Sequence, residues 1–135
     1  MHVQLRRWRA MLGIALVAVA GPAAFASSEA EVPEAAEVCL SCHAFQPGEP
    51  ELEGPTLWGV MGRRIAGAPD YVYSEALRGQ QGTWDRVTLD RFLASPQEFA
   101  PGVNMTFGGV RSAADRQVVI DFLETLRPEG PQAGQ

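Results

Sequence analysis

Two cysteines and a histidine between positions 39 and 43 are the residues of this chain best suited to chemistry. Cys39, Cys42 and His43 form the pattern C-x-x-C-H, and the chain contains no other cysteine. Two thiols at this spacing can each add to a vinyl group of one haem and form a thioether, and the histidine that follows can bind the haem iron. The pattern therefore predicts a single covalently attached c-type haem, whose iron would carry the chemistry.

Three other interpretations of the two cysteines are open. A thioredoxin-like redox pair needs a βαβ context, and nothing before Cys39 resembles a buried strand. A structural zinc site needs four ligands, and the only other histidine, His2, lies in a segment that we expect to be removed. A disulfide between Cys39 and Cys42 would close a loop of two residues and constrain little. The spacing and the adjacent histidine favour haem attachment.

The first 26 residues have the pattern of a secretory signal peptide. Three arginines between positions 6 and 9 give a basic start, residues 10–20 are apolar, and Ala24-Phe25-Ala26 matches a cleavage site. The apolar run is well short of the roughly 20 residues that span a bilayer, and a retained membrane anchor is the alternative. We expect a mature chain from Ser27 in the periplasm, with no stable membrane insertion after cleavage.

The mature chain is acidic. The residues after Ala26 carry all 16 acidic side chains but only eight arginines and no lysine, a formal net charge of −8. Seven glutamates lie between Glu29 and Glu53, on both sides of the C-x-x-C-H pattern. A field of this sign affects encounter rates and the choice of partner, which makes nucleic acid and anionic membranes poor partners. We expect a monomer whose acidic surface either serves solubility or docks a basic face of a redox partner.

The sequence predicts that the elements that position the motif are helices separated by long loops. Pro33 can start a helix that continues to Cys39, and period-two strand patterns are nearly absent. Three further helices are expected, at residues 75–78 behind Ser74, at 87–94, and at 113–127 behind Ser112. Loops this long are unusual in a small domain, and a buried haem that they wrap would account for them. The result is one all-α domain over residues 33–127, with a loose leader at 27–32 and a disordered tail at 128–135.

A low-spin electron carrier needs a second axial ligand, and methionine sulfur in that place raises the redox potential. Met105 lies in the loop 101–105 between two expected helices, whereas Met61 lies only 18 residues after His43. Methionine is ordinarily core filler. That interpretation is preferred for Met61, and residue type and loop position alone leave it open for Met105.

From Cys39 to Leu126 the chain resembles a class I cytochrome c of the mitochondrial and bacterial c2 type, over about four fifths of the mature chain. The resemblance rests on Cys39–His43, Gly54–Gly59 with Gly62-Arg63, Tyr71–Ser74, Gly82-Thr83-Trp84, Phe92-Leu93 with Pro96, Pro101–Met105 with Phe107 and Gly109, and the last helix. It implies the class I cytochrome c fold, in which several short helices and long loops wrap one covalently bound haem. It also implies a set of roles: Met105 as the sixth iron ligand, the Pro55 carbonyl as acceptor for the His43 ring N–H, and Arg63, Tyr73 and Trp84 near the haem propionates.

The chain departs from that family at several positions. Phe92, Leu77 and Val103 replace a tyrosine, an asparagine and a threonine beside the haem, so we expect a drier pocket without a water network behind Met105. Alanines at 35 and 36 replace a glycine and aromatic pair, which should weaken the contact with the last helix. Asn104 and the absence of lysine remove the basic ring that docks acidic partners in many members. Association with the partner should therefore depend weakly on salt or require a basic surface.

The resemblance implies single-electron transfer between periplasmic or membrane redox partners, and no catalytic acid, base or nucleophile is evident. Two alternatives come from other classes of protein. One is the haem subunit of a periplasmic dehydrogenase complex. The other is a haem sensor or ligand-binding protein in which Met105 is labile.

Overall fold

The structure is a computed structural model, and it describes residues 31–127. The expected signal peptide (1–26), most of the expected leader (27–30) and the expected tail (128–135) lie outside the described residues. None of the helices between residues 31 and 127 is both long and apolar enough to cross a lipid bilayer.

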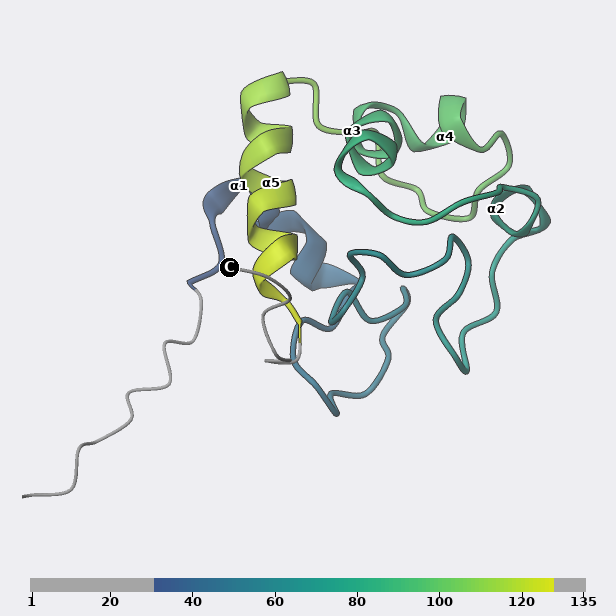
Figure 1. Cartoon of the computed structure of the whole chain (residues 1–135), viewed down its shortest axis with the longest axis horizontal. Coiled ribbons are helices and arrows are strands. Elements are labelled where there is room, and N and C mark those ends of the chain that lie inside the picture. Colours follow the sequence, from purple (N-terminus) through teal and green to yellow (C-terminus); the bar gives the residue numbers. More distant parts are fainter. Residues whose placement is uncertain (1–30, 128–135) are drawn as a thin grey trace, which may run out of the picture.

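Short helices and long loops make up the described part of the chain (Figure 1). The elements are α1 (Glu34–Glu37), the 3-10 helix η1 (Val38–Ser41), α2 (Glu75–Arg78), α3 (Arg86–Ala94), α4 (Pro96–Phe99) and α5 (Ala113–Thr125). Over residues 31–127 the only β contact is an isolated bridge between Arg64 and Thr83. The prediction of an all-α fold is confirmed.

Three of the helices begin where a polar side chain accepts a hydrogen bond from the first turn. The Ser74 hydroxyl accepts from the Leu77 N–H, and the Ser112 hydroxyl accepts from the Asp115 N–H, as predicted. At α3 the Asp85 carboxylate accepts from the Thr88 N–H. This cap starts the helix one residue earlier than expected, because an N-cap side chain satisfies an amide that has no partner within the helix.

The structure corrects the sequence-based boundaries in two places. The segment expected as one helix from Pro33 to Cys39 divides into the single turn α1 and the tighter turn η1. The helix expected at 87–94 does end at Ala94, but Pro96 then begins a further helix, α4, that was not expected from the sequence. The first turn of a helix tolerates proline because the N–H there has no intrahelical partner.

The core lies where α5 meets α1 and α3, and α4 packs beside α3. Figure 1 shows α5 upright with α1 beside it, α3 and α4 to one side, and long loops filling the other half. α1 packs against α5 although alanines replace the glycine and aromatic residue of the family. Ala36 of α1 is buried and only 1% exposed. Phe45, which follows the C-x-x-C-H pattern, packs edge-on against Phe122 of α5 at 5.4 Å between ring centroids.

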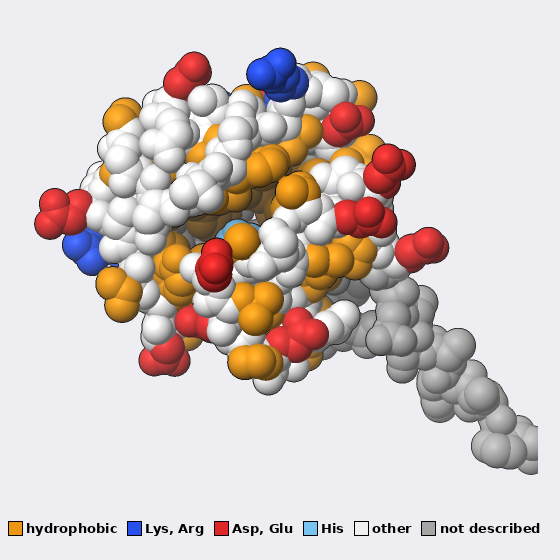
Figure 2. All heavy atoms as spheres, turned by 180° about the vertical axis from the view of Figure 1, so that it is seen from behind, with side chains coloured by type: hydrophobic (Ala, Val, Ile, Leu, Met, Phe, Trp, Pro, Cys, Tyr) orange, Lys and Arg blue, Asp and Glu red, His pale blue; other side chains and the backbone are white. Residues whose placement is uncertain are grey.

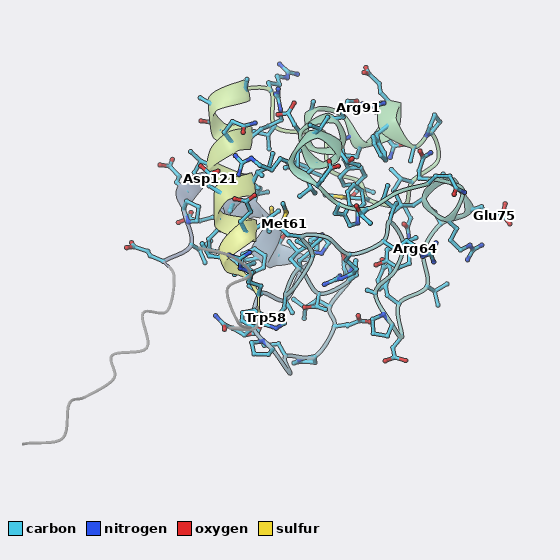
Figure 3. The ribbon with its side chains drawn as sticks, in the orientation of Figure 1. Trp58, Met61, Arg64, Glu75, Arg91 and Asp121 are labelled. Carbon is cyan, nitrogen blue, oxygen red and sulfur yellow. The ribbon has the colours of Figure 1, made fainter. Side chains whose placement is uncertain are left out.

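Ion pairs also join α3 to α5. Arg86 donates to Asp121 at 2.6 Å and to Glu124 at 2.7 Å. One turn further along α3, Asp90 accepts from Arg116 at 2.8 Å. Asp121 is labelled on α5 in Figure 3. These pairs fix the two longest helices against each other above the loop half of the molecule.

Candidate functional site

A cavity of about 350 Å³ lies between the helices and the loops, and every site residue expected from the sequence lines it. These residues are Cys39, Cys42, His43, Pro55, Arg63, Tyr73, Trp84 and Met105. Figure 2 shows the cavity as a hollow on the face opposite the view of Figure 1, with a histidine side chain visible inside it. Met61 does not line the cavity and packs, partly buried, against the core.

The imidazole of His43 is held in one orientation. Its Nδ1 lies 2.7 Å from the Pro55 carbonyl oxygen, and because a carbonyl can only accept, Nδ1 carries the proton. Burial lowers the pKa of His43, and the hydrogen bond to Pro55 opposes this shift only in part. A neutral imidazole with Nδ1 protonated leaves the lone pair of Nε2 available for a metal.

Gly54 packs against the face of the same ring, and the sequence-based reasoning gave it no role of its own. A Cβ at this position would lie 2.4 Å from Cε1 and 2.6 Å from Nδ1 of His43. The Gly54 N–H donates to the Cys42 carbonyl at 2.7 Å, which ties this loop to the motif. The signal was present in the sequence as the glycine directly before Pro55.

The two thiols lie on the same side of one helical turn. Cys39 is within η1 and Cys42 directly follows it. In a 3-10 helix, side chains three residues apart lie on the same side, and both cysteines line the cavity. Both cysteines are free thiols in the structure. Burial raises the pKa of Cys39, and the Cys42 sulfur lies 3.7 Å from a Glu53 carboxylate oxygen.

Met105 reaches the cavity from a loop that is anchored at both ends. Gln97 donates to the carbonyls of Val103 at 2.9 Å and Met105 at 3.2 Å. Beyond Met105, the Val110 N–H donates to the Leu93 carbonyl at 2.8 Å. Gly109 has φ +93°, and a Cβ there would lie 2.3 Å from the Ala94 carbonyl oxygen. Nothing in the sequence indicated that Gln97 would hold the Met105 loop, because this contact depends on where α4 lies in space.

Arg63, Tyr73 and Trp84 all line the cavity, and the Trp84 backbone N–H donates to the Arg63 carbonyl at 2.8 Å. The Arg63 guanidinium donates to the Thr56 carbonyl at 2.9 Å and also to the Trp58 carbonyl. The Tyr73 hydroxyl accepts from the Ala68 N–H at 3.2 Å. Burial raises the pKa of Tyr73, while the Ala68 hydrogen bond and the Arg63 charge oppose that shift. A guanidinium, a phenol and an indole thus belong to residues that line the cavity.

The wall behind Met105 is apolar. Leu77, Phe92 and Val103, which the resemblance places near Met105, all line the cavity and are buried, and no polar or charged residue between 31 and 127 is buried. The Phe92 ring packs against Trp84 at 5.0 Å between centroids. The three replacements noted in the sequence therefore put hydrocarbon where the family resemblance leads one to expect polar groups.

The residues around the cavity fit a covalently attached haem. Two thiols lie on one side, an oriented imidazole with a free Nε2 and a thioether sulfur both reach the cavity, and most of the wall is apolar. Gly54 leaves the His43 ring room that a side chain would take. Among residues 31–127, no three His, Cys, Asp or Glu side chains form a group that could hold a metal ion by themselves.

Comparisons with known proteins agree with this geometry, although a scan against models of protein families finds no match. A cytochrome c homolog of Rickettsia bellii is 44% identical over 92 residues, which cover 68% of this chain and 53% of the relative. The chain thus spans about half the length of that relative. Cytochrome c2 of Rhodoblastus acidophilus is 35% identical over 92 residues, 68% of this chain and 86% of its own.

Among solved structures, cytochrome cH from Methylobacterium extorquens matches with a TM-score of 0.63 and 37% sequence identity. The match covers 67% of this chain and 91% of that one. Similarity at this level over most of a relative's length, together with the cavity and its ligand set, shows that the chain belongs to the class I cytochrome c family.

Proposed function

We propose that this protein is a single-electron carrier with one covalently bound haem c. The observation that carries the proposal is that an oriented His43, both thiols and Met105 line one apolar cavity. Cytochromes named c, c2 and cH among its relatives support the same role. The haem, when bound, supplies an iron that gains and loses one electron.

In this proposal each residue of the chain has a holding or tuning role. Cys39 and Cys42 would hold the haem through two thioethers, and His43 and Met105 would bind its iron. The Pro55 carbonyl keeps the His43 ring in the tautomer that presents Nε2. The sulfur of Met105 favours a high redox potential.

Three donor groups in the cavity lining complete the site. We assign Arg63, Tyr73 and Trp84 to the haem propionates, because a guanidinium, a phenol and an indole N–H are suitable donors to buried carboxylates. All three line the cavity. The role needs no catalytic acid, base or nucleophile.

We further propose that the chain acts as a monomer in the bacterial periplasm. The support is the signal-peptide pattern of residues 1–26 and the chemistry of haem attachment, which requires reduced thiols on an exported chain. An N-terminal mass that begins at Ser27 would support cleavage after Ala26.

The test is the optical spectrum of protein matured in a periplasm with haem-attachment machinery. We expect a low-spin c-type spectrum with a weak far-red sulfur-to-iron band, and we expect that band to disappear in Met105→Ala but remain in Met61→Ala. A high-spin spectrum that changes with carbon monoxide in the ferrous state would instead indicate a ligand-binding protein. The absence of covalent haem would overturn the proposal.

A further inference from the structure

The rim of the cavity is nearly uncharged. The residues that both line the cavity and are exposed border its mouth, and they are Val38, Ser41, Glu53, Asn104 and Thr106. Only Glu53 among them is charged, and Val38 is 52% exposed. The mouth therefore presents a neutral, partly apolar edge with one carboxylate.

Acidic side chains flank this edge. Residues 31–62 contain six glutamates and no lysine or arginine. Glu37 directly precedes Val38, and Glu51 lies two positions before Glu53; both are exposed. Leu52 between the last two is 52% exposed and extends the apolar part of the surface. Figure 2 shows acidic side chains on several sides of the hollow, whereas the few basic ones appear only near the outline of this face.

Several of the arginines have partners away from the mouth. Arg86 and Arg116 are bound to carboxylates between α3 and α5, and Arg63 donates to two backbone carbonyls inside the loop half. The charges of Arg86 and Arg116 are therefore offset by carboxylates. Within residues 31–127, no arginine is among the exposed residues that line the cavity, and the acidic residues among or beside them are Glu37, Glu51 and Glu53.

We propose that this mouth docks a redox protein whose contact surface has an apolar centre ringed by lysine or arginine side chains. The proposal rests on the proposed function and adds the chemistry of the partner. Opposite charge around the contact speeds encounter and orients the approach. An apolar centre excludes water from the contact between the two proteins. A partner with an acidic ring would meet like charges from Glu37, Glu51 and Glu53.

Two double variants of the holoprotein separate a local effect from the overall charge. Glu37→Gln/Glu53→Gln removes two charges at the mouth. Glu75→Gln/Asp115→Asn removes two exposed charges that do not line the cavity, and Glu75 projects away from α2 at the edge of the molecule (Figure 3). The reduced proteins are oxidised by tris(phenanthroline)cobalt(III), a tripositive reagent with apolar ligands, at low ionic strength and with rates corrected for measured midpoint potentials.

We expect the mouth variant to react at least about threefold more slowly than the parent protein. The decrease in rate for the control variant should be less than half of the decrease for the mouth variant. The trinegative reagent ferricyanide should show the opposite change. A second readout needs no electron transfer: a lysine octapeptide, titrated calorimetrically, should bind at least about threefold more weakly to the mouth variant than to the control. Equal effects of the two double variants, or no binding of the peptide to the parent protein, would overturn the proposal.

The apolar part of the surface has its own test. Val38→Thr/Leu52→Asn should slow the reaction with the phenanthroline reagent but leave unchanged the inhibition of that reaction by hexaamminechromium(III), an equally charged polar cation that accepts no electron. An unchanged rate with the phenanthroline reagent, or inhibition weakened to the same degree as that rate, would remove the apolar centre from the proposal. A protein that carries haem and exchanges electrons, but whose mouth and control variants behave alike, would refute the docking surface while the proposed function stands.

Discussion

At the scale of single residues, the site depends on how closely the loop at Gly54 and Pro55 approaches His43. The Pro55 carbonyl orients the imidazole through a hydrogen bond, and Gly54, which has no side chain, leaves space for the ring. Neither contribution needs a charged or reactive side chain. The identity of the ligand is local to the C-x-x-C-H pattern, but its orientation comes from a loop twelve residues away.

Gly54→Ala should destabilise the protein by about 1 to 3 kcal/mol, because the added methyl group overlaps the His43 ring. The ring must turn or the loop must move, and either change weakens the bond to the Pro55 carbonyl. Denaturant unfolding of the holoprotein measures the loss. Gly108→Ala is the matched control, since nothing lies within 4 Å of its Cβ position. Equal stability of the two variants would show that the loop adapts without cost.

Phe92→Tyr should raise the redox potential by some tens of millivolts. Phe92 is buried in the cavity wall behind Met105, and a hydroxyl there can donate to the methionine sulfur and reduce the electron density that it gives to the iron. Phe99→Tyr adds the same hydroxyl to the same aromatic cluster at a residue outside the cavity lining. Potentiometric titration of both variants makes the comparison. An unmoved potential in Phe92→Tyr would count against the apolar wall.

At the scale of elements, α3 and α5 form the rigid part of the fold, and their mutual position determines where the Met105 loop starts and ends. Arg116 is the most buried cation of the interface, with 13% of its side chain exposed. It donates to Asp90 on α3 and to the carbonyls of Val110 and Arg111. It thus joins both helices to the end of the loop that carries Met105.

Asp90→Asn should destabilise the protein at neutral pH but not in acid. The hydrogen bond from Arg116 lowers the pKa of Asp90 below its ordinary value. Because the folded-state pKa lies below the unfolded one, the stabilisation is complete above about pH 4 and is lost as the pH falls through the folded-state value. Denaturant midpoints between pH 7 and pH 3 test this. The midpoints of wild type and variant should converge in acid, whereas Glu98→Gln, whose carboxylate has no ion pair among residues 31–127, should follow wild type throughout.

Helix starts were predictable from sequence where a cap residue lies next to the helix it caps. Ser74 and Ser112 are examples, because the hydrogen bond spans only three residues. The division of the first helix into α1 and η1 was not predictable. There the chain must turn Cys39 and Cys42 toward a cavity whose other walls come from distant segments. The same holds for α4, whose start at Pro96 allows Gln97 to reach the Met105 loop.

At the scale of the whole molecule, the hydrophobic core surrounds the cavity, because many of the buried core residues also line it. Most helices here have only four residues, and α5, the longest, has 13. Helices this short are marginal in water without tertiary packing. Leucine, valine and aromatic side chains from every part of the described chain face the cavity, so the group that fills it should organise the fold.

Cys39→Ala/Cys42→Ala, produced without covalent haem, should therefore be expanded and less helical than the holoprotein. The apolar cavity wall would lack its partner, and the short helices would lose their packing. Far-ultraviolet circular dichroism and size-exclusion chromatography give the measurement. Met105→Ala, which keeps both thioethers, is the control and should remain compact. A haem-free variant as compact and helical as the holoprotein would contradict the idea that the haem organises this core.

The sequence by itself determined the chemistry of this protein. The spacing of Cys39, Cys42 and His43, the family pattern around Met105 and the acidic composition are all properties of residue type and order. The tertiary structure decided which groups meet: Gly54 against His43, Gln97 under the Met105 loop, and Arg116 between α3 and that loop's end. These contacts join segments far apart in the chain or depend on the angle between neighbouring turns. The spacing of residues in the sequence therefore does not predict them. The neutral mouth within an acidic surface was also decided by the tertiary structure, because the fold determines which charged side chains lie at the rim of the cavity.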